Sequence, residues 1–557
     1  MEEVRVRCGY LLVMVACGGT DPPDPQPQPL PVPAPPPVQP APAAAGAHPC
    51  APGEGDRVGE WRYALTGGMY ERTLDVTRDQ LVVAWRAGKI AASADVRAAL
   101  APALGAPGRE RAEWTIVPAH ELAPAQTVIT VEHRHPLASV DGPLVVAMCG
   151  GGAPVHNIDP AKLTTLVMSG TTAMTGRLAR RIDEDGVRDT VRYIQPFFAS
   201  ADLVHISNEV SFVRHCDPLA GQEELKFCSR DSYIEVLEAL HAKIIELTGS
   251  HLIDHGHHPL LRTIDAYQRR GWIWFGGGRT QLDATTPRIV EHHGNKLAFV
   301  GCNAVAAWVR AVGQGPGVAA CDLARVVWQV QDLRRRGLLP IVSVQHQETH
   351  IHDVPPKLVS DLRRLAEAGA AFVMGSQAHS AHPWDIHYGA YVHYGPGNIL
   401  FAQDREAQRE ATVDKLYFHD GRLLSVEHLF TRIEHGRPRL LSDDERARFL
   451  AEIVRVEGNV PPPEPAGTPA LPAEDRTRPD SVVIKGRNQY LLVTAPERVT
   501  PGTRYPLVVD LKGTAQRDDA YVVTPKGKSR ATGKDIARFM RKKYPIDPRK
   551  ISVRRHQ

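Results

Sequence analysis

The chain has 557 residues, of which 43% are hydrophobic and 23% are charged, so it can form several globular domains with at least one large core. Its formal net charge of +3 is too small to indicate a nucleic-acid partner. No apolar run is long enough to be a membrane span that is retained in the mature protein.

The amino terminus has the pattern of an export signal. Arg5 and Arg7 precede a short apolar segment, residues 9–16, which is followed by Cys17. A small residue before such a cysteine resembles the lipobox of bacterial lipoproteins, in which the cysteine is lipidated after cleavage. We therefore expect residues 1–17 to be a lipoprotein-type signal that directs the protein to the cell envelope, in the periplasm or on the outer surface, and anchors it to the membrane. The alternative is an ordinary buried amino-terminal segment.

A Pro-rich segment and a set of cysteines follow this signal. Residues 18–58 are expected to be an extended polyproline II linker, which serves either as a stalk or as a spacer without further function. Two of the eight cysteines lie in the signal, and the six that remain are an even number, which agrees with an exported, oxidised protein. Two pairings would each close a short loop, Cys216 with Cys228 and Cys302 with Cys321, although six cysteines allow many others.

Residues 59–155 are predicted to form a small α/β domain without a catalytic motif. Short apolar runs predict its strands, and one stretch has helical character. The expected strands are residues 81–85, 114–117, 128–131 and 144–148, and the expected helix is near 93–104.

Residues 160–435 alternate apolar strands with polar loops and helices. A strand, a polar loop, a helix and a second strand form the βαβ unit of a parallel sheet, which places the polar loops at one carboxyl edge. Ligands and catalytic groups collect at that edge in open α/β sheets. We therefore expect the functional site there. The expected strands are 164–168, 201–206, 243–247, 272–275, 297–300, 339–344 and 371–374, with helices at 259–270 and 355–369.

Five segments of this domain carry the pattern of a known family. They are SGTTAMTGR (169–177), ADLVHISNEVSF (201–212), LTGSHLIDHG (247–256), VQHQETH (344–350) and GSQAHSAHPWDIHYGAYVHYGPGNILFAQ (375–403). In this order they resemble the CapA family of bacterial poly-γ-glutamate capsule synthesis proteins, which has a calcineurin-like metallophosphoesterase fold. The resemblance covers roughly residues 60–435. It implies an α/β metallophosphoesterase sandwich, preceded by the small α/β domain.

The resemblance also implies a divalent metal site, whose expected ligands are altered in this chain. Metallophosphoesterases hold two metal ions about 3.5–4 Å apart, which clamp both the attacking and the leaving oxygen. The positions that commonly carry Asp, Asn and His in the family are Thr171, Ser250 and Gln377 here. Because these replacements erode a two-metal site, the remaining polar residues would hold one divalent metal ion or would act without a metal.

Eleven candidate site residues follow from the resemblance and from their positions at strand ends. The expected proton-transfer residues are His346, His379 and Glu348. The expected metal ligands are Asn208, Glu209, His251 and Asp254. The expected substrate contacts are Thr171, Arg177, Gln377 and Asn398. The alternative is that these polar side chains only satisfy the backbone of their loops.

The carboxyl-terminal part, which follows a second Pro-rich linker at 458–480, resembles a different class of enzyme. RYPLVVDLKGTAQ (504–516) and KKYPIDPRKISV (542–553) are similar to the start of a polyhydroxybutyrate-depolymerase-type α/β-hydrolase. The chain contains no G-x-S-x-G nucleophile elbow, and Lys512 stands where such enzymes usually carry a His. We therefore expect residues 481–557 to be a truncated, catalytically incomplete α/β fragment.

Together these patterns predict an exported CapA-like protein that acts in the synthesis, release or trimming of an anionic cell-surface polymer such as poly-γ-glutamate. If the chain is an enzyme, hydrolysis by a metal-bound or base-activated water is the expected class. The alternative is a non-catalytic polymer-binding or assembly factor with a degenerate metal site, which Thr171, Ser250 and Gln377 favour. A phosphodiesterase acting on nucleotides or lipids rests on fold analogy alone. Nucleic acid is not an expected partner.

Overall fold

The computed structural model describes residues 5–6, 47–51, 54–108, 111–150, 155–219, 226–403, 405–458, 460, 477–484, 487–494, 505–510, 521–525, 536–538, 540–541 and 546–554. The chain divides into two compact units, one made of Met1–Tyr10 with Val32–Pro461 and the other of Leu11–Pro31 with Pro462–Gln557. The predicted signal and both Pro-rich linkers lie largely outside the described residues. Within the described ranges, no helix is long and apolar enough to cross a membrane.

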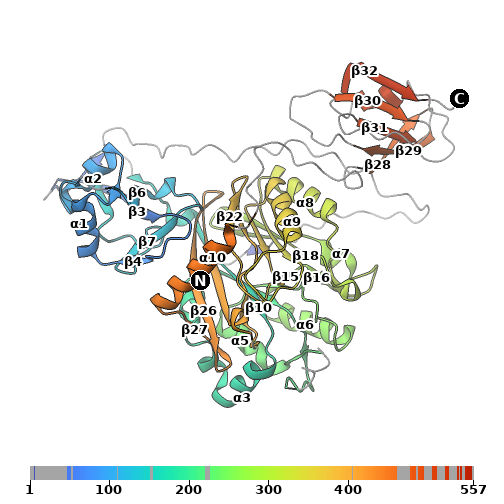
Figure 1. The fold of residues 1–557 in the computed structure, drawn as a ribbon, viewed down its shortest axis with the longest axis horizontal. Helices are drawn as coiled ribbons and strands as arrows, with labels where there is room; N and C mark the ends of the chain where they lie inside the picture. The colour runs from blue at the N-terminus through green and yellow to red at the C-terminus, as the bar shows by residue number, and fades with distance from the viewer. Residues whose placement is uncertain are drawn as a thin grey trace. The chain divides into compact units, whose positions relative to one another are not determined.

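A small α/β domain comes first in the chain (Figure 1). Its sheet is built on β3 (Arg57–Gly67), which pairs with β6 (Trp114–Pro118), β7 (Thr127–Val131), β8 (Val145–Cys149) and β9 (Val155–His156). The short strands are β2 (His48–Pro49), β4 (Asp75–Val76) and β5 (Ile90–Ala91), and the helices are α1 (Arg78–Ala87) and α2 (Ala94–Leu104). The three predicted strands after residue 110 and the predicted helix are confirmed.

The strand predicted at residues 81–85 is wrong, because this segment lies inside α1. Thr77 caps the helix: its hydroxyl accepts from the Gln80 backbone N–H at 3.2 Å, and the Gln80 side chain accepts from the Thr77 backbone N–H at 2.8 Å. Gly88, with φ of 93°, ends the helix in the left-handed conformation. The capping box and the glycine are therefore stronger signals than the short apolar run between them.

Residues 163–440, together with a short strand at residues 5–6, form two mixed β-sheets that pack face to face (Figure 1). The first sheet has the order β1 (Arg5–Val6), β17 (Arg288–His292), β18 (Asn295–Asn303), β20 (Leu339–Gln345), β21 (Phe372–Gly375), β23 (Ala390–His393), β22 (Trp384–His387). The second has the order β15 (Ile273–Phe275), β14 (Ile244–Glu246), β11 (Leu203–Asn208), β10 (Leu163–Thr172), β25 (Glu410–His419), β26 (Arg422–Glu434), β27 (Arg437–Leu440), with β24 (Asn398–Leu400) beside β10.

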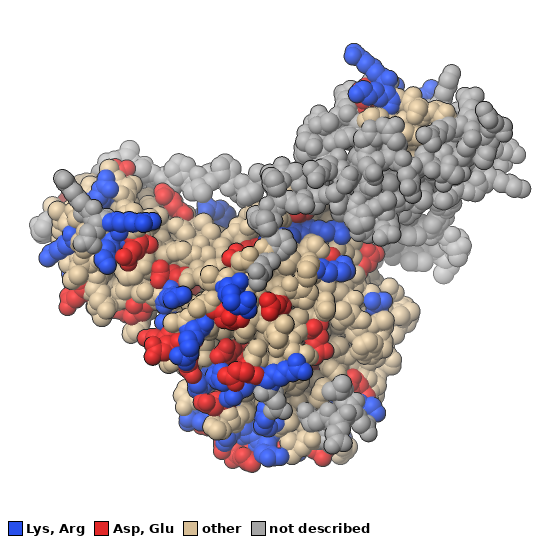
Figure 2. All heavy atoms as spheres, in the orientation of Figure 1, with Lys and Arg blue, Asp and Glu red and all other residues tan. Residues whose placement is uncertain are grey.

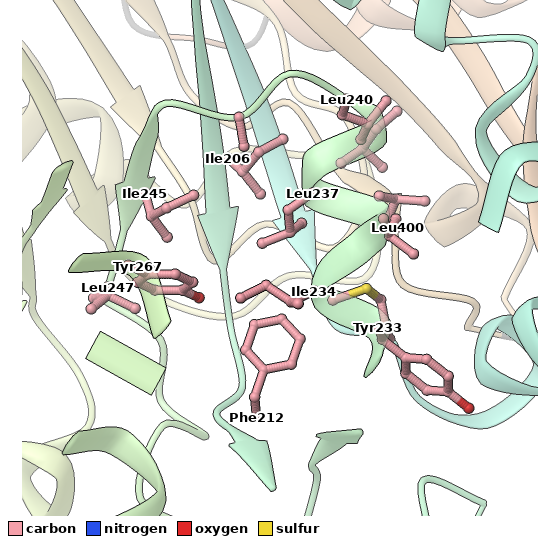
Figure 3. Packing of buried hydrophobic residues seen from close by; sticks show 14 of the residues in the cluster. Ile206, Phe212, Tyr233, Ile234, Leu237, Leu240, Ile245, Leu247, Tyr267 and Leu400 are labelled. Atoms are coloured by element: carbon pink, nitrogen blue, oxygen red, sulfur yellow. The ribbon is translucent and has the colours of Figure 1, made fainter. Parts of the chain in front are cut away.

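Helices cover the outer faces of the sheets, so three apolar layers stabilise the sandwich. The middle layer, which includes Met168 and Phe372, lies between the two sheets. A second layer packs the sheet of β11 and β14 against helices, and Figure 3 shows Ile206 and Ile245 of the strands with Leu237 of the helix opposite. The third layer packs the other sheet against three helices. The helices are α3 (Gly176–Val191), α4 (Gln195–Ala199), α5 (Ile234–Ala239), α6 (His257–Arg269), α7 (Gln281–Thr285), α8 (Leu323–Arg335), α9 (Pro356–Glu367) and α10 (Asp443–Glu457).

The predicted βαβ arrangement is confirmed. β18, β20 and β21 are parallel neighbours, as are β10, β11, β14 and β15. Pro356 occupies the first turn of α9, and Gly369, with φ of 101°, follows its end. Each of the seven strands expected between 160 and 380 is present. The α/β sandwich is thus confirmed, and its parallel strands bring their polar carboxyl ends to one edge.

Disulfides tie several loops of this unit. Cys216 bonds Cys228, and Cys302 bonds Cys321, so both short-loop pairings are confirmed. A third disulfide joins Cys50 to Cys149. Two short two-stranded pairings lie close to these loops: β12 (Phe212–Val213) with β13 (Ser229–Arg230), and β16 (Gly277–Gly278) with β19 (Gly317–Val318).

The carboxyl-terminal unit contains a five-stranded sheet in the order β28 (Thr477–Ile484), β29 (Arg487–Thr494), β31 (Tyr521–Pro525), β30 (Tyr505–Asp510), β32 (Ile546–Arg554). β30 pairs in parallel with β31 and β32, whereas β28, β29 and β31 are antiparallel. The hydrolase-like role of this fragment stays a prediction.

Candidate functional site

The last residues of β20 divide between the two faces of the sheet. Because alternate residues of a strand point to opposite faces, Ser343 and Gln345 share one face and Val344 and His346 the other. Val344 packs in the layer beneath α8 and α9. Gln345 instead donates from Nε2 to Glu209 Oε2 at 2.8 Å, across the gap between the two sheets. β20 therefore brings Gln345, a residue not predicted, to the junction of the two sheets.

Glu209 is the buried centre of this junction, with 3% of its surface exposed. Its Oε1 accepts from the Ser250 backbone N–H at 2.8 Å and from the Ser250 hydroxyl at 2.9 Å. Burial raises the pKa of the Glu209 carboxyl, and the charge of His251 and the bonds from Ser250 and Gln345 only partly oppose this effect. Glu209 therefore holds a proton to a higher pH than an ordinary glutamate.

His251 and Asp254 form a hydrogen-bonded pair next to Glu209. His251 Nδ1 lies 2.7 Å from Asp254 Oδ2, and the same oxygen accepts from the Phe227 backbone N–H at 2.8 Å. Burial lowers the pKa of His251, but the Asp254 bond and the negative charges of Glu209 and Asp254 outweigh it, so the net pKa is raised. His251 is therefore a proton-holding group at the mouth of the junction.

A second group of polar residues surrounds His379. Its Nδ1 lies 2.9 Å from Asn398 Oδ1, an arrangement in which the ring donates, and its Nε2 lies 3.5 Å from Glu348. Glu348 also lies 3.2 Å from His350, whose ring stacks on that of His379. Burial lowers the pKa of His379 more than the bond to Asn398 raises it. His379 is therefore a neutral base whose Nε2 faces Glu348.

Two phenylalanines join the two polar groups. Phe227 meets His251 edge to face with ring centroids 4.7 Å apart, and Phe401 meets His379 with centroids 5.4 Å apart. The two phenylalanine rings themselves are 5.9 Å apart and pack in one small buried cluster. These ring contacts place both polar groups in one site. The structure thus brings Glu209, His251, Asp254, Glu348 and His379 together.

His346 is not part of this group. Its Nε2 lies 3.0 Å from Asp361 Oδ2 on α9, and Lys357 donates to the same oxygen at 2.9 Å. The pKa of Asp361 is lowered, because the bonds from His346 and Lys357 outweigh the opposing effect of burial. His346 therefore ties the end of β20 to a helix, and its predicted part in proton transfer has no geometric support.

The other predicted residues line the same edge with different partners. Thr171 donates from its hydroxyl to the Ser376 carbonyl at 2.9 Å, and Asn208 donates from Nδ2 to the Tyr267 hydroxyl at 3.0 Å. The amide oxygens of Asn208 and Gln377 are buried and have no hydrogen-bond partner within the described part of the chain. Arg177 is exposed and donates to the Gln403 carbonyl at 3.1 Å.

The donor set does not fit the divalent metal site that the resemblance implies. Both oxygens of Glu209 already accept hydrogen bonds from neutral donors, and Asp254 is bonded to His251. Thr171 and Gln345 add no charge to the site. In the described ranges, no three His, Cys, Asp or Glu side chains converge in a way that could hold a metal ion. These residues favour bound protons and hydrogen bonds.

Comparison with known proteins finds similarity over the central part of the chain. Residues 165–403 match the family described as bacterial capsule synthesis protein PGA_cap. A curated relative, the PGA biosynthesis protein CapA of Bacillus subtilis, is 20% identical over 43% of this chain and 64% of its own length. The probable polyglutamine synthesis accessory protein of Mycobacterium tuberculosis is 28% identical over 40% of this chain and 64% of its own length.

Among solved structures, a 5'-nucleotidase precursor from Thermus thermophilus aligns with a TM-score of 0.31 and 14% identity, covering 53% of this chain and 58% of that one. The chain spans less than two thirds of the length of the two curated relatives named above. The matched region contains the whole site, from Thr171 to Asn398. Residues 165–403 of the chain are thus similar to the CapA family of capsule synthesis proteins.

Proposed function

We propose that this chain is an accessory factor in the synthesis or surface assembly of an anionic polymer such as poly-γ-glutamate, and that its site binds the polymer without cleaving it. The observation that carries this proposal is the bonding of Glu209, whose two oxygens accept from Ser250 and Gln345. A carboxyl group held in this way is not available to clamp a pair of metal ions.

The names of the relatives support the polymer part of the proposal. One is called a PGA biosynthesis protein, and another a probable polyglutamine synthesis accessory protein. A carboxylate polymer would need hydrogen-bond donors and cations that it can reach from solvent. Arg177 and Lys226 are exposed, and Lys226 directly precedes Phe227 of the site. His251 adds a proton-holding ring at the mouth.

The charge distribution argues for local rather than long-range recognition. Figure 2 shows acidic and basic side chains interspersed on the face in view, without a large patch of one sign. The net charge of the whole chain is only +3. Attraction of a polyanion would therefore depend on the few groups at the site, and moderate salt would weaken it only partly.

A metal-free hydrolase is the second candidate function. It is favoured by His379, whose lowered pKa leaves a neutral ring, and by the raised pKa of Glu209, which together form a base and an acid in one site. In this case Glu348 would orient the ring of His379, which lies 3.5 Å away.

One experiment separates the two functions. Poly-γ-glutamate of defined length is titrated into the full chain, and the recovered polymer is sized afterwards. We expect saturable binding, unchanged polymer length and no effect of a chelator. His251→Ala should weaken binding about tenfold, because a charged hydrogen bond is lost. The matched control is His258→Ala, which removes an exposed histidine in the following helix and should leave binding unchanged. Shortened polymer would instead establish the hydrolase, and absence of binding by the wild type would refute the proposal.

A further inference from the structure

A loop closed by the disulfide Cys302–Cys321 exposes apolar side chains beside α7. On this loop, Trp308 is 70% exposed, Val312 is 74% exposed and Val305 is 44% exposed, and on α7 Leu282 is 76% exposed. Soluble proteins rarely leave several large apolar side chains together in water unless the surface has a partner. We call Leu282, Val305, Trp308 and Val312 the Trp308 patch.

Backbone contacts place the members of the Trp308 patch next to one another. The Gln281 N–H donates to the Gly313 carbonyl at 3.0 Å, and the Gly313 N–H donates to the Gln281 side chain at 3.1 Å. Leu282 directly follows Gln281, and Val312 directly precedes Gly313. Trp308 is four residues from Val312, a separation that an extended chain spans in at most about 14 Å. The four exposed side chains therefore belong to one loop and to the helix that is hydrogen-bonded to it.

The loop is held firmly, so the exposure of Trp308 belongs to the folded state. Ala306 and Val309, on either side of Trp308, are buried in the layer that includes α6. The Val305 and Ala306 N–H groups both donate to Asn303 Oδ1, at 2.9 and 2.7 Å. The Ala311 N–H donates to the Val318 carbonyl at 2.9 Å.

The charges around the patch suit an anionic, apolar surface. Residues 303–320 contain no Asp or Glu, and Arg310 is their one charged residue. On α7 and just before it, Asp283 pairs with Arg288, and Arg279 pairs with Asp265 at 2.6 Å. Contact with a negatively charged bilayer would thus meet no unpaired acid in this loop, and the Arg310 guanidinium would favour it.

We propose that the Trp308 patch docks on the surface of an anionic lipid bilayer. Tryptophan is enriched at membrane interfaces because its ring is apolar and its N–H is polar, and Val and Leu beside it add apolar area. The sequence predicts a lipidated Cys17 and a Pro-rich spacer, a tether that would keep the domain close to lipid and make a weak contact effective. A bilayer is therefore the occupant that this chain itself would supply.

Docking by this patch would orient the site relative to the bilayer. Asn303, which caps the start of the loop, donates from Nδ2 to Gln345 Oε1 at 3.2 Å, and Gln345 binds Glu209. The patch thus begins at the same sheet edge as the polymer site. A polymer emerging at the membrane would then meet the site without the domain having to reorient.

The test uses the full chain carrying Cys17→Ser, so that lipid cannot be attached at that position. Its cosedimentation is measured with vesicles of phosphatidylethanolamine and phosphatidylglycerol, and with phosphatidylcholine vesicles. We expect binding that is stronger to the anionic vesicles, and Trp308→Ala with Val312→Ser should lower the partition coefficient by about tenfold or more. The control Val83→Ser removes an equally exposed apolar residue on α1, and should leave binding unchanged.

Two results would overturn the proposal. In one, the Cys17→Ser chain does not bind vesicles, or the patch variants bind as well as it does while circular dichroism shows them folded. In the other, sedimentation shows a dimer of the chain that Trp308→Ala dissociates, and vesicles do not compete with it. The second result would assign the patch to another copy of the chain.

Discussion

Glu209 and Asp414 are both buried carboxyl groups of the same sandwich, yet their surroundings shift their pKa values in opposite directions. Asp414, between the two sheets, accepts from His393 Nδ1 at 2.6 Å and from His428 Nδ1 at 2.9 Å. These imidazoles lower its pKa strongly although burial opposes them. Glu209, at the sheet edge, accepts only from the neutral groups of Ser250 and Gln345, and its pKa is raised.

The difference shows what each region is built for. A buried carboxylate that receives N–H groups from two titratable rings stays charged and holds the sheets together. A buried carboxyl with neutral donors and one histidine nearby has its pKa raised by burial, so it holds its proton to a higher pH than an ordinary glutamate. Position in the sandwich and charge of the partners, rather than burial itself, separate the interior from the site.

The largest effect should come from removing the charge of Asp414, which is bonded to His393 and His428 between the two sheets. Asp414→Asn removes the charge that His393 and His428 bind, so we expect the free energy of unfolding to fall by about 3–5 kcal/mol. Denaturant unfolding of the full chain, followed by circular dichroism, measures this. A loss below about 1 kcal/mol would mean that Asp414 does not form a charged interaction with His393 and His428.

The same pair predicts the acid limb of stability. Because the pKa of Asp414 is depressed in the folded state, its contribution is complete above the unfolded value of about 3.9 and is lost as the pH falls below it toward the folded pKa. The wild type should therefore lose stability more steeply than Asp414→Asn below about pH 4. Parallel slopes of the two proteins across that range would contradict the assignment.

Polymer binding at the sheet edge should respond to pH in the direction opposite to the stability that Asp414 contributes. The pKa of His251 is raised, so its charged form persists to a higher pH than an ordinary histidine and is lost as the pH rises through the folded value. Polymer binding by the wild type should weaken as the pH rises above neutrality, and His251→Gln should bind weakly at every pH. If His251→Gln keeps the pH dependence of the wild type, that pH dependence belongs to another titratable group.

The smallest effect should come from Glu209→Gln. Because burial raises the pKa of Glu209, its charge should stabilise the fold less than that of Asp414, and an amide of the same shape should change the free energy of unfolding by less than about 1 kcal/mol. The matched comparison is Asp414→Asn in the same assay. A loss as large as that of Asp414→Asn would show that Glu209 is a charged group and would remove the contrast between the two regions.

The fold was largely predictable because its signals are local. Pro355 and Pro356, with Gly369 at the far end, bracket α9, and apolar runs mark β20 and β21. The error at residues 81–85 came from weighing a short apolar run above the capping box of Thr77 and Gln80, which is an equally local signal. The sequence around residues 81–85 therefore contained the signals of a helix.

The site was less predictable, because it depends on which face of the sheet each residue of a strand points to and on hydrogen-bond partners that are distant in the sequence. A parallel strand buried on both faces is apolar throughout, so the sequence of β20 does not show whether Gln345 or His346 faces the other sheet. His346 was predicted as a site residue because it directly follows this strand, within the segment VQHQETH that resembles the family. Its partner Asp361 lies 15 residues away on a helix. Only the folded chain decides such pairings.

If the proposed site binds an anionic polymer through protons and hydrogen bonds, without a metal ion, polymer binding should not depend on divalent cations. The most direct measurement is equilibrium dialysis of the full chain against poly-γ-glutamate, before and after chelator treatment, with metal content determined on the same samples. We expect equal polymer retention in both samples and far less than one metal ion per chain. Retention that is lost on chelation and returns when a divalent cation is added back would contradict it.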